Sequence, residues 1–178
     1  MHFFTSVVCV INPERGQQEI HFPAINWLSS YSLYPQALDQ WYRDNIASDF
    51  PEVRTEISTL LQIEAELQEI VQLVGSDALP IDQQLTLEVA RMIREFFLQQ
   101  NAFHDVDTFS DLKLQYDMAK AILNFQEEGK KAIAGGAQLE DVVNVPARTD
   151  LMRGRFEEGY DGRIESLVSE MGKQIAAS

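Results

Sequence analysis

Basic and thiol side chains are scarce in this sequence. Its 178 residues include 14 Lys and Arg against 28 Asp and Glu, which gives a formal net charge of −14, and Cys9 is the single cysteine. Nucleic-acid binding depends on clustered cations that release counterions from phosphates, so this composition argues against a nucleic-acid partner. One cysteine cannot form an internal disulfide, which favours a reducing, cytosolic setting.

Long apolar runs are missing as well. No stretch approaches the roughly 20 apolar residues that span a bilayer, so direct membrane insertion is not expected. The apolar start, Met1 to Ile11, lacks a basic flank and a small-residue cleavage site, and a polar segment follows it at once. We therefore interpret residues 1–20 as a short strand or a tail rather than an export signal.

A phosphate-binding loop is not found either. Such a loop needs spaced glycines and a Lys followed by Ser or Thr. Gly129-Lys130 is followed by Lys131, and Gly172-Lys173 is followed by Gln174. We therefore expect no catalytic residue in this chain and no nucleotide hydrolysis by the chain alone.

Histidine is also too sparse to suggest a metal centre. The three histidines show no i, i+4 pairing, so no metal ligands are expected. His104 beside Asp105 and Asp107 is compatible with a metal or acid/base cluster, but a solvated loop whose acids cap the next helix explains it better.

The sequence does have the composition of a globular protein, with 45% hydrophobic residues, and a helical spacing of those residues. From Pro23 onward apolar residues recur at steps of three and four. We predict an all-α fold, a compact antiparallel bundle of about five to seven helices after a short non-helical N-terminal segment. The expected helices cover about 36–47, 51–74, 80–97, 111–134, 139–143 and 164–175.

Several residues are expected to mark helix ends. Asp49 with Glu52 fits a capping box, and Thr108 with Asp111 is expected to cap the helix that follows. Gly75 fits a helix stop and Pro80 a helix start.

Side-chain environments are predicted from the same spacing. The buried stripe of the 51–74 helix should extend through Ile70, Val71 and Val74. The polar face of that helix should carry Glu64, Glu66 and Glu69 in solvent, and Trp27 and Trp41 are expected as core anchors rather than as a ligand cage.

Three segments resemble a known family. They are His21-Phe22-Pro23-Ala24-Ile25-Asn26-Trp27-Leu28-Ser29-Ser30-Tyr31-Ser32-Leu33-Tyr34, then Glu69 to Gly75 followed by Asp77-Ala78-Leu79, then Gln100-Asn101-Ala102-Phe103-His104-Asp105-Val106-Asp107. In this order they resemble the C-terminal helical domain of the catalytic A subunit of V-type and archaeal-type rotary ATPases. The resemblance covers residues 21–178, and residues 1–20 do not match.

The resemblance implies the function of a larger machine. In this family, the A and B subunits alternate around a rotating shaft and couple ATP hydrolysis or synthesis to proton or sodium transport. The implied partners are the B subunits, the central-shaft subunits and the preceding part of the same polypeptide, in a cytoplasmic head peripheral to the membrane. The phosphate loop and catalytic Glu belong to that preceding part. ATP or ADP with Mg is therefore implied for the full-length polypeptide, whereas no cofactor is implied for this chain alone.

The resemblance also assigns two groups of site residues. Phe103 takes the place of the aromatic that stacks on adenine, with Gln100, Asn101 and Ala102 shaping the rim; the alternative is an ordinary buried Phe. The rotor-facing loop comprises Gly75, Ser76, Asp77, Ala78, Leu79, Pro80, Ile81 and Asp82. With only Asp77 and Asp82 acidic, steric pushing tuned by charge is expected there; the alternative is an ordinary capped turn.

Two other functions stay open at this point. The chain could be a standalone non-enzymatic interaction module with another partner, which a binding assay against B and shaft subunits would separate. A small helical enzyme built on residues 104–107 would require ordered metal at that cluster.

Overall fold

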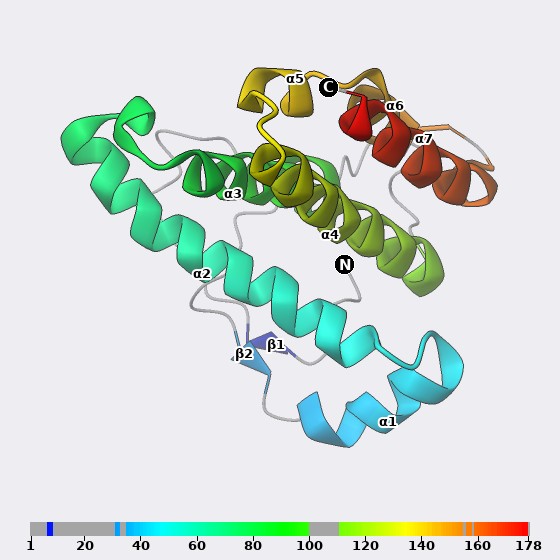
Figure 1. The fold of residues 1–178 in the computed structure, drawn as a ribbon. Helices are drawn as coiled ribbons and strands as arrows, with labels where there is room; N and C mark the ends of the chain where they lie inside the picture. Colours follow the sequence, from blue (N-terminus) through cyan, green and yellow to red (C-terminus); the bar gives the residue numbers. More distant parts are fainter. Residues whose placement is uncertain are drawn as a thin grey trace.

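The structure is a computed structural model that describes residues 7–8, 31–32, 35–99, 111–154, 156–157 and 159–177. These ranges contain seven α-helices, two 3-10 turns, one π-helix and two strands of two residues each (Figure 1). The elements are β1 Val7–Val8, β2 Tyr31–Ser32, α1 Pro35–Asn45, α2 Phe50–Val74, η2 Ser76–Ala78, α3 Ile81–Met92, η3 Ile93–Leu98, α4 Leu112–Ala134, α5 Leu139–Val143, α6 Pro146–Gly154, η4 Tyr160–Arg163 and α7 Ile164–Ala176. The predicted all-α bundle is confirmed.

The N-terminal segment contributes strand β1, which pairs antiparallel with β2. The second strand, Tyr31–Ser32, was not predicted, since two residues are too few to show alternation.

Helix α4 is the centre of the bundle. It packs against α2, α3 and α7, and α6 packs on α7 (Figure 1). The apolar stripes of these helices meet in one core, whose fully buried members include Phe50, Ile57, Leu85, Val89, Ile122, Phe125, Leu151 and Met171. Burial of side chains of this size stabilises a fold by roughly 1.5–3 kcal/mol each relative to exposure, before the loss of conformational entropy is subtracted.

The capping box predicted at the start of α2 is wrong. Asp49 is the N-cap residue, but its side chain makes no capping hydrogen bond. Its carboxylate accepts from the Tyr116 hydroxyl and from Lys120, both on α4, and Glu52 pairs instead with Arg43 on α1. Tertiary partners therefore outcompete the local backbone N–H groups.

The start of α4 agrees only partly with prediction. Asp111 caps this helix by accepting from the Leu114 backbone N–H at 2.7 Å, so it occupies the N-cap position itself. Thr108, the other residue expected to cap this helix, lies outside the described residues.

The third predicted helix is divided. It begins at Ile81, with Pro80 as the N-cap, and changes from α-helix to π-helix at Ile93. Helix α6 was not predicted, and it ends where Gly154 lies under the ring of Tyr160. The Tyr160 hydroxyl donates to the Leu151 carbonyl at 2.6 Å, and burial raises its pKa, so it stays a donor at neutral pH.

Candidate functional site

The α2–α3 turn lies at the end of α2 that is opposite α1, at the left edge of Figure 1. Gly75 ends α2 with a φ of +85° and a ψ of 160°, a conformation essentially restricted to glycine. The short turn η2 follows, and the Leu79 N–H donates to the Ser76 carbonyl at 3.1 Å. Gln84 then donates its side-chain N–H to the Leu79 carbonyl at 2.8 Å. These bonds define a compact, closed tip.

Most of the tip side chains are exposed. Leu79 is buried, whereas Gly75, Ser76, Asp77, Ala78, Pro80, Ile81 and Asp82 are exposed. The Asp77 carboxylate accepts from the Ser76 hydroxyl at 3.1 Å. The structure thus brings the predicted loop residues together at one exposed end of the bundle, with Leu79 turned inward as its anchor.

Apolar side chains are unusually exposed at this end. Leu73 is 85% exposed, Val74 60%, Ile81 45% and Ile70 44%. The prediction that Ile70 and Val74 belong to the buried stripe is wrong, because the stripe is covered only where α3 and α4 lie against α2. We call Ile70, Leu73, Val74 and Ile81 the apolar tip. Large exposed apolar side chains grouped at one end of a molecule commonly mark contact sites.

A largely buried ion pair joins the middle of α2 to η3. Glu64 Oε1 and Arg94 Nη2 are 2.8 Å apart, with 8% and 24% of their side chains exposed. The predicted solvated position of Glu64 is wrong, whereas Glu66 and Glu69 are exposed as predicted. The burial of Glu64 could have been predicted from the sequence, because Glu64 lies three residues from both Leu61 and Leu67 and therefore on the apolar stripe.

Arg94 belongs to the π-helix η3, which leads to the predicted adenine rim. The Gln99 N–H donates to the Arg94 carbonyl at 3.0 Å, an i to i+5 bond that closes the last π turn. Gln100, Asn101, Ala102 and Phe103 follow directly in sequence but lie outside the described residues, as do His104, Asp105 and Asp107. The rim assignment therefore stays a prediction.

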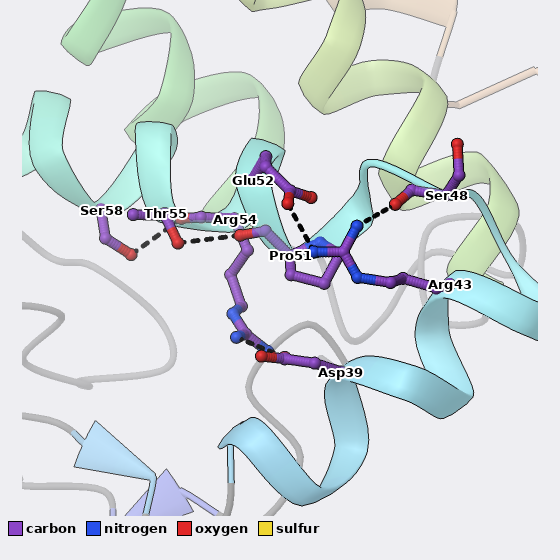
Figure 2. Close-up of polar contacts among 8 residues, drawn as sticks. All are labelled: Asp39, Arg43, Ser48, Pro51, Glu52, Arg54, Thr55 and Ser58. Atoms are coloured by element: carbon purple, nitrogen blue, oxygen red, sulfur yellow. Dashed lines mark hydrogen bonds and ion pairs between the residues drawn. The ribbon is translucent and has the colours of Figure 1, made fainter.

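Ion pairs fasten α1 to the base of α2 (Figure 2). Arg54 on α2 contacts Asp39 on α1 at 2.8 Å, and Arg43 on α1 contacts Glu52 on α2. Arg43 also donates to the Ser48 carbonyl in the connecting turn. The hydrogen bond from Arg43 lowers the pKa of Glu52, so that carboxylate stays ionised and paired at neutral pH. Each helix therefore supplies the cation of one pair and the anion of the other, and together the two pairs orient α1 against α2.

Aromatic stacking adds to this junction. The rings of Tyr42 and Phe50 stack with centroids 4.4 Å apart, and Tyr42 is buried. Trp41 is 48% exposed and touches Tyr42 edge-on, so its prediction as a core anchor is wrong. Neighbouring helical residues point about 100° apart, and Tyr42 takes the direction that faces the core. Trp27 lies outside the described residues.

Neither metal binding nor membrane spanning finds support in the part of the chain that the structure describes. No group of three or more His, Cys, Asp or Glu side chains there is arranged to hold a metal ion. None of the helices in the same ranges combines the length and the apolar character needed to cross a membrane.

Comparison with known proteins gives a family match over most of these elements. Residues 39–143 match the family described as the C-terminal domain of V and A type ATP synthase. This range begins in α1, includes the tip and the ion pair of α2 with η3, and ends with α5.

Full-length relatives agree with the family match. The chain is 52% identical over 155 residues to the A subunit of the A-type ATP synthase of Natronomonas pharaonis and 47% identical over 160 residues to that of Methanosarcina mazei. It is 48% identical over 156 residues to the V-type ATP synthase alpha chain 1 of Clostridium tetani. These alignments cover 87–90% of the chain and only 26–28% of each relative. The chain thus spans about a quarter of their length.

Proposed function

Because the chain belongs to the family of C-terminal domains of V- and A-type ATP synthases, we propose that it is the C-terminal part of a catalytic A subunit. In this role it contacts the central rotor through the α2–α3 tip and closes the adenine side of the nucleotide site. It thereby couples ATP hydrolysis or synthesis to proton or sodium transport. The chain contributes no catalytic group, since the preceding part of the polypeptide would bind the phosphates and Mg.

The observation that carries the rotor contact is the apolar tip. Leu73 and Val74, 85% and 60% exposed, lie next to the glycine that ends α2. Exposed apolar side chains gain free energy when a partner surface removes them from water, at roughly 25 cal/mol per Å². A partner that packs on the tip would therefore be held by shape and apolar contact, with Asp77 and Asp82 beside it adjusting the fit.

The shape of α2 supports transmission of force. With 25 residues and a rise of 1.5 Å per residue, α2 is about 37 Å long. The ion pairs with α1 hold its base, and α3 and α4 pack along it. A push at the tip would move this helix as a stiff rod.

The adenine contact rests on the sequence resemblance and on chain position. Phe103 follows η3 by five residues, and a flat aromatic ring suits a base whose phosphates are held elsewhere. We expect Phe103→Ala in the assembled ATPase to raise the KM for ATP, and Phe103→Tyr to preserve it. An unchanged KM in Phe103→Ala would reject the rim assignment.

The rotor contact is tested in the same assembled ATPase by the double variant Leu73→Ser/Val74→Ser. We expect ion transport per ATP hydrolysed to fall while the KM for ATP is unchanged. The matched control is Ile63→Ser, which also alters an exposed apolar residue of α2 but lies away from the tip. Equal coupling in the tip variant and the control would reject this contact.

The carboxylates of the tip allow a second test of the rotor contact. Asp77→Ala/Asp82→Ala should alter the coupling of ATP hydrolysis to ion transport and leave nucleotide affinity nearly unchanged. A large loss of nucleotide affinity would contradict the proposed position of this loop at the rotor.

Two further experiments test the proposal with the isolated chain. Failure of the isolated chain to bind B or shaft subunits would instead favour a standalone interaction module. Robust ATP hydrolysis by the purified chain, abolished by one substitution in it, would reject the non-catalytic role.

A further inference from the structure

We propose that the Glu64–Arg94 ion pair is a positioning device that ties α2, the helix carrying the tip, to the segment that leads into the nucleotide rim. Through this pair, the position of α2 sets how tightly the rim holds the adenine. The inference rests on the proposed function and assigns a role to two residues that lie outside both the tip and the predicted rim.

The burial of the pair is the first argument. Glu64 keeps 8% and Arg94 24% of its side chain exposed, and Glu64 Oε1 is 2.8 Å from Arg94 Nη2. Removing two charges from water costs free energy that their attraction repays only in good geometry, so a buried ion pair is a weak stabiliser. Removing one partner is strongly disruptive, which means that the pair constrains where its two helices lie.

Arg94 makes a second link, through its backbone. Its side chain reaches α2, while its carbonyl accepts from Gln99, the last described residue before the rim. One residue thus connects the middle of α2 to the end of η3. The next residue in sequence is Gln100, the first of the four rim residues.

The π-helix makes this link sensitive to position. A π turn is rare, and such turns occur frequently at functional sites. Within η3, Ile93, Phe96 and Leu98 are buried and cannot slide without disturbing the core. Because η3 packs against α4 as well as continuing α3, a shift of Glu64 would pull on a closely packed segment.

The test uses the assembled rotary ATPase with Glu64→Gln and Arg94→Gln in this chain. We expect each variant to raise the KM for ATP about tenfold, equal to ~1.4 kcal/mol of binding free energy, with kcat changed much less. The charge-exchanged double variant Glu64→Arg/Arg94→Glu should recover most of the affinity. Should a Gln variant fail to assemble, Glu64→Asp and Arg94→Lys keep the charges and should give a smaller rise in KM.

A second ion pair supplies the matched control. Glu88 and Arg148 are 2.7 Å apart and partly buried, and they join α3 to α6 rather than to α2. Glu88→Gln should lower the melting temperature of the domain and leave the KM for ATP unchanged. An equal rise in KM for Glu64→Gln and Glu88→Gln would show a merely structural role and overturn the inference.

The remaining outcomes separate this inference from the proposed function. If Phe103→Ala raises the KM while Glu64→Gln and Arg94→Gln leave it unchanged, the positioning role is wrong and the rim assignment stands. If Phe103→Ala also has no effect, the rim assignment itself fails and the inference falls with it.

Discussion

The Tyr116 hydroxyl donates to Asp49 Oδ1 at 2.6 Å, although 67 positions separate the two residues. Lys120, one helical turn after Tyr116 on α4, contacts Oδ2 of the same carboxylate at 2.8 Å. The start of α2 is thereby held by α4, beside the ion pairs that hold it to α1. The Tyr116 phenol stays a donor at neutral pH, because burial and its bond to the Asp49 carboxylate raise its pKa.

Tyr116→Phe should lower the free energy of unfolding of the chain by about 1 kcal/mol, because it removes one net hydrogen bond to a charged but partly hydrated acceptor. Urea denaturation at neutral pH measures this difference. The comparison is Lys120→Met. This variant removes a salt bridge that is about half exposed and should contribute less than about 1 kcal/mol. A Tyr116→Phe variant as stable as the parent would contradict this account.

Acid should weaken the same junction. The hydrogen bonds from Lys120 and then Tyr116 lower the pKa of Asp49 in the folded chain, whereas the unfolded carboxyl has a pKa near 3.9. A lowered folded pKa contributes stability above pH ~4, and this contribution is lost as the pH falls through the folded value. The stability difference between the parent and Asp49→Asn should therefore shrink as the pH falls from about 5 to 3. A difference independent of pH in this window would exclude the mechanism.

Gly154→Ala should destabilise the domain, because a Cβ at this position would lie 1.8 Å from the Tyr160 ring. The ring is buried and its hydroxyl is bound to Leu151, so it cannot move away freely. Overpacking of this kind costs about 1–3 kcal/mol. Thermal unfolding is the measurement, and Gly172→Ala is the control. Gly172 lies inside α7 with only one side-chain atom as near as 4.0 Å, so alanine there should raise stability by roughly 0.5–1 kcal/mol.

Gly75→Ala should be unfavourable for a different reason. Nothing lies within 4 Å of a Cβ at Gly75, but its φ of +85° with ψ of 160° is strained for any L side chain, at a cost on the order of 1–3 kcal/mol. Chemical denaturation of the isolated chain should show this loss. Gly162→Ala, also free of contacts and without a positive φ, should change stability by less than about 0.5 kcal/mol. Equal effects at both glycines would refute the conformational argument.

Helix positions were largely predictable because apolar spacing is a local property of the chain. The ranges of α2, α5 and α7 follow from steps of three and four residues with their flanking Gly or Pro signals. The π-helix was not predicted in this way, since Ile93, Phe96 and Phe97 satisfy an ordinary helical stripe. In the π-helix Leu98, five residues after Ile93, is buried, whereas Phe97 is only partly buried. Packing of these side chains against α4, rather than their order, accompanies the wider turn.

Part of the candidate site was predictable from the sequence and part was not. The tip residues were identified from a resemblance, and the structure gathers them at one exposed end, although the rotor contact itself stays a proposal. The Glu64–Arg94 pair was missed, because thirty positions of sequence separate two residues that only the antiparallel return of α3 and η3 brings together.

The sequence by itself determined the helical class of this protein, its main helix boundaries and, through its motifs, its family. Only the tertiary structure decided which members of each stripe are covered. Burial depends on where neighbouring helices lie: Leu67 is enclosed, whereas Val74, seven residues later on the same face of α2, is 60% exposed. Tertiary packing likewise decided the partner of Asp49, because two donors from α4 bind its carboxylate in place of the backbone of its own helix.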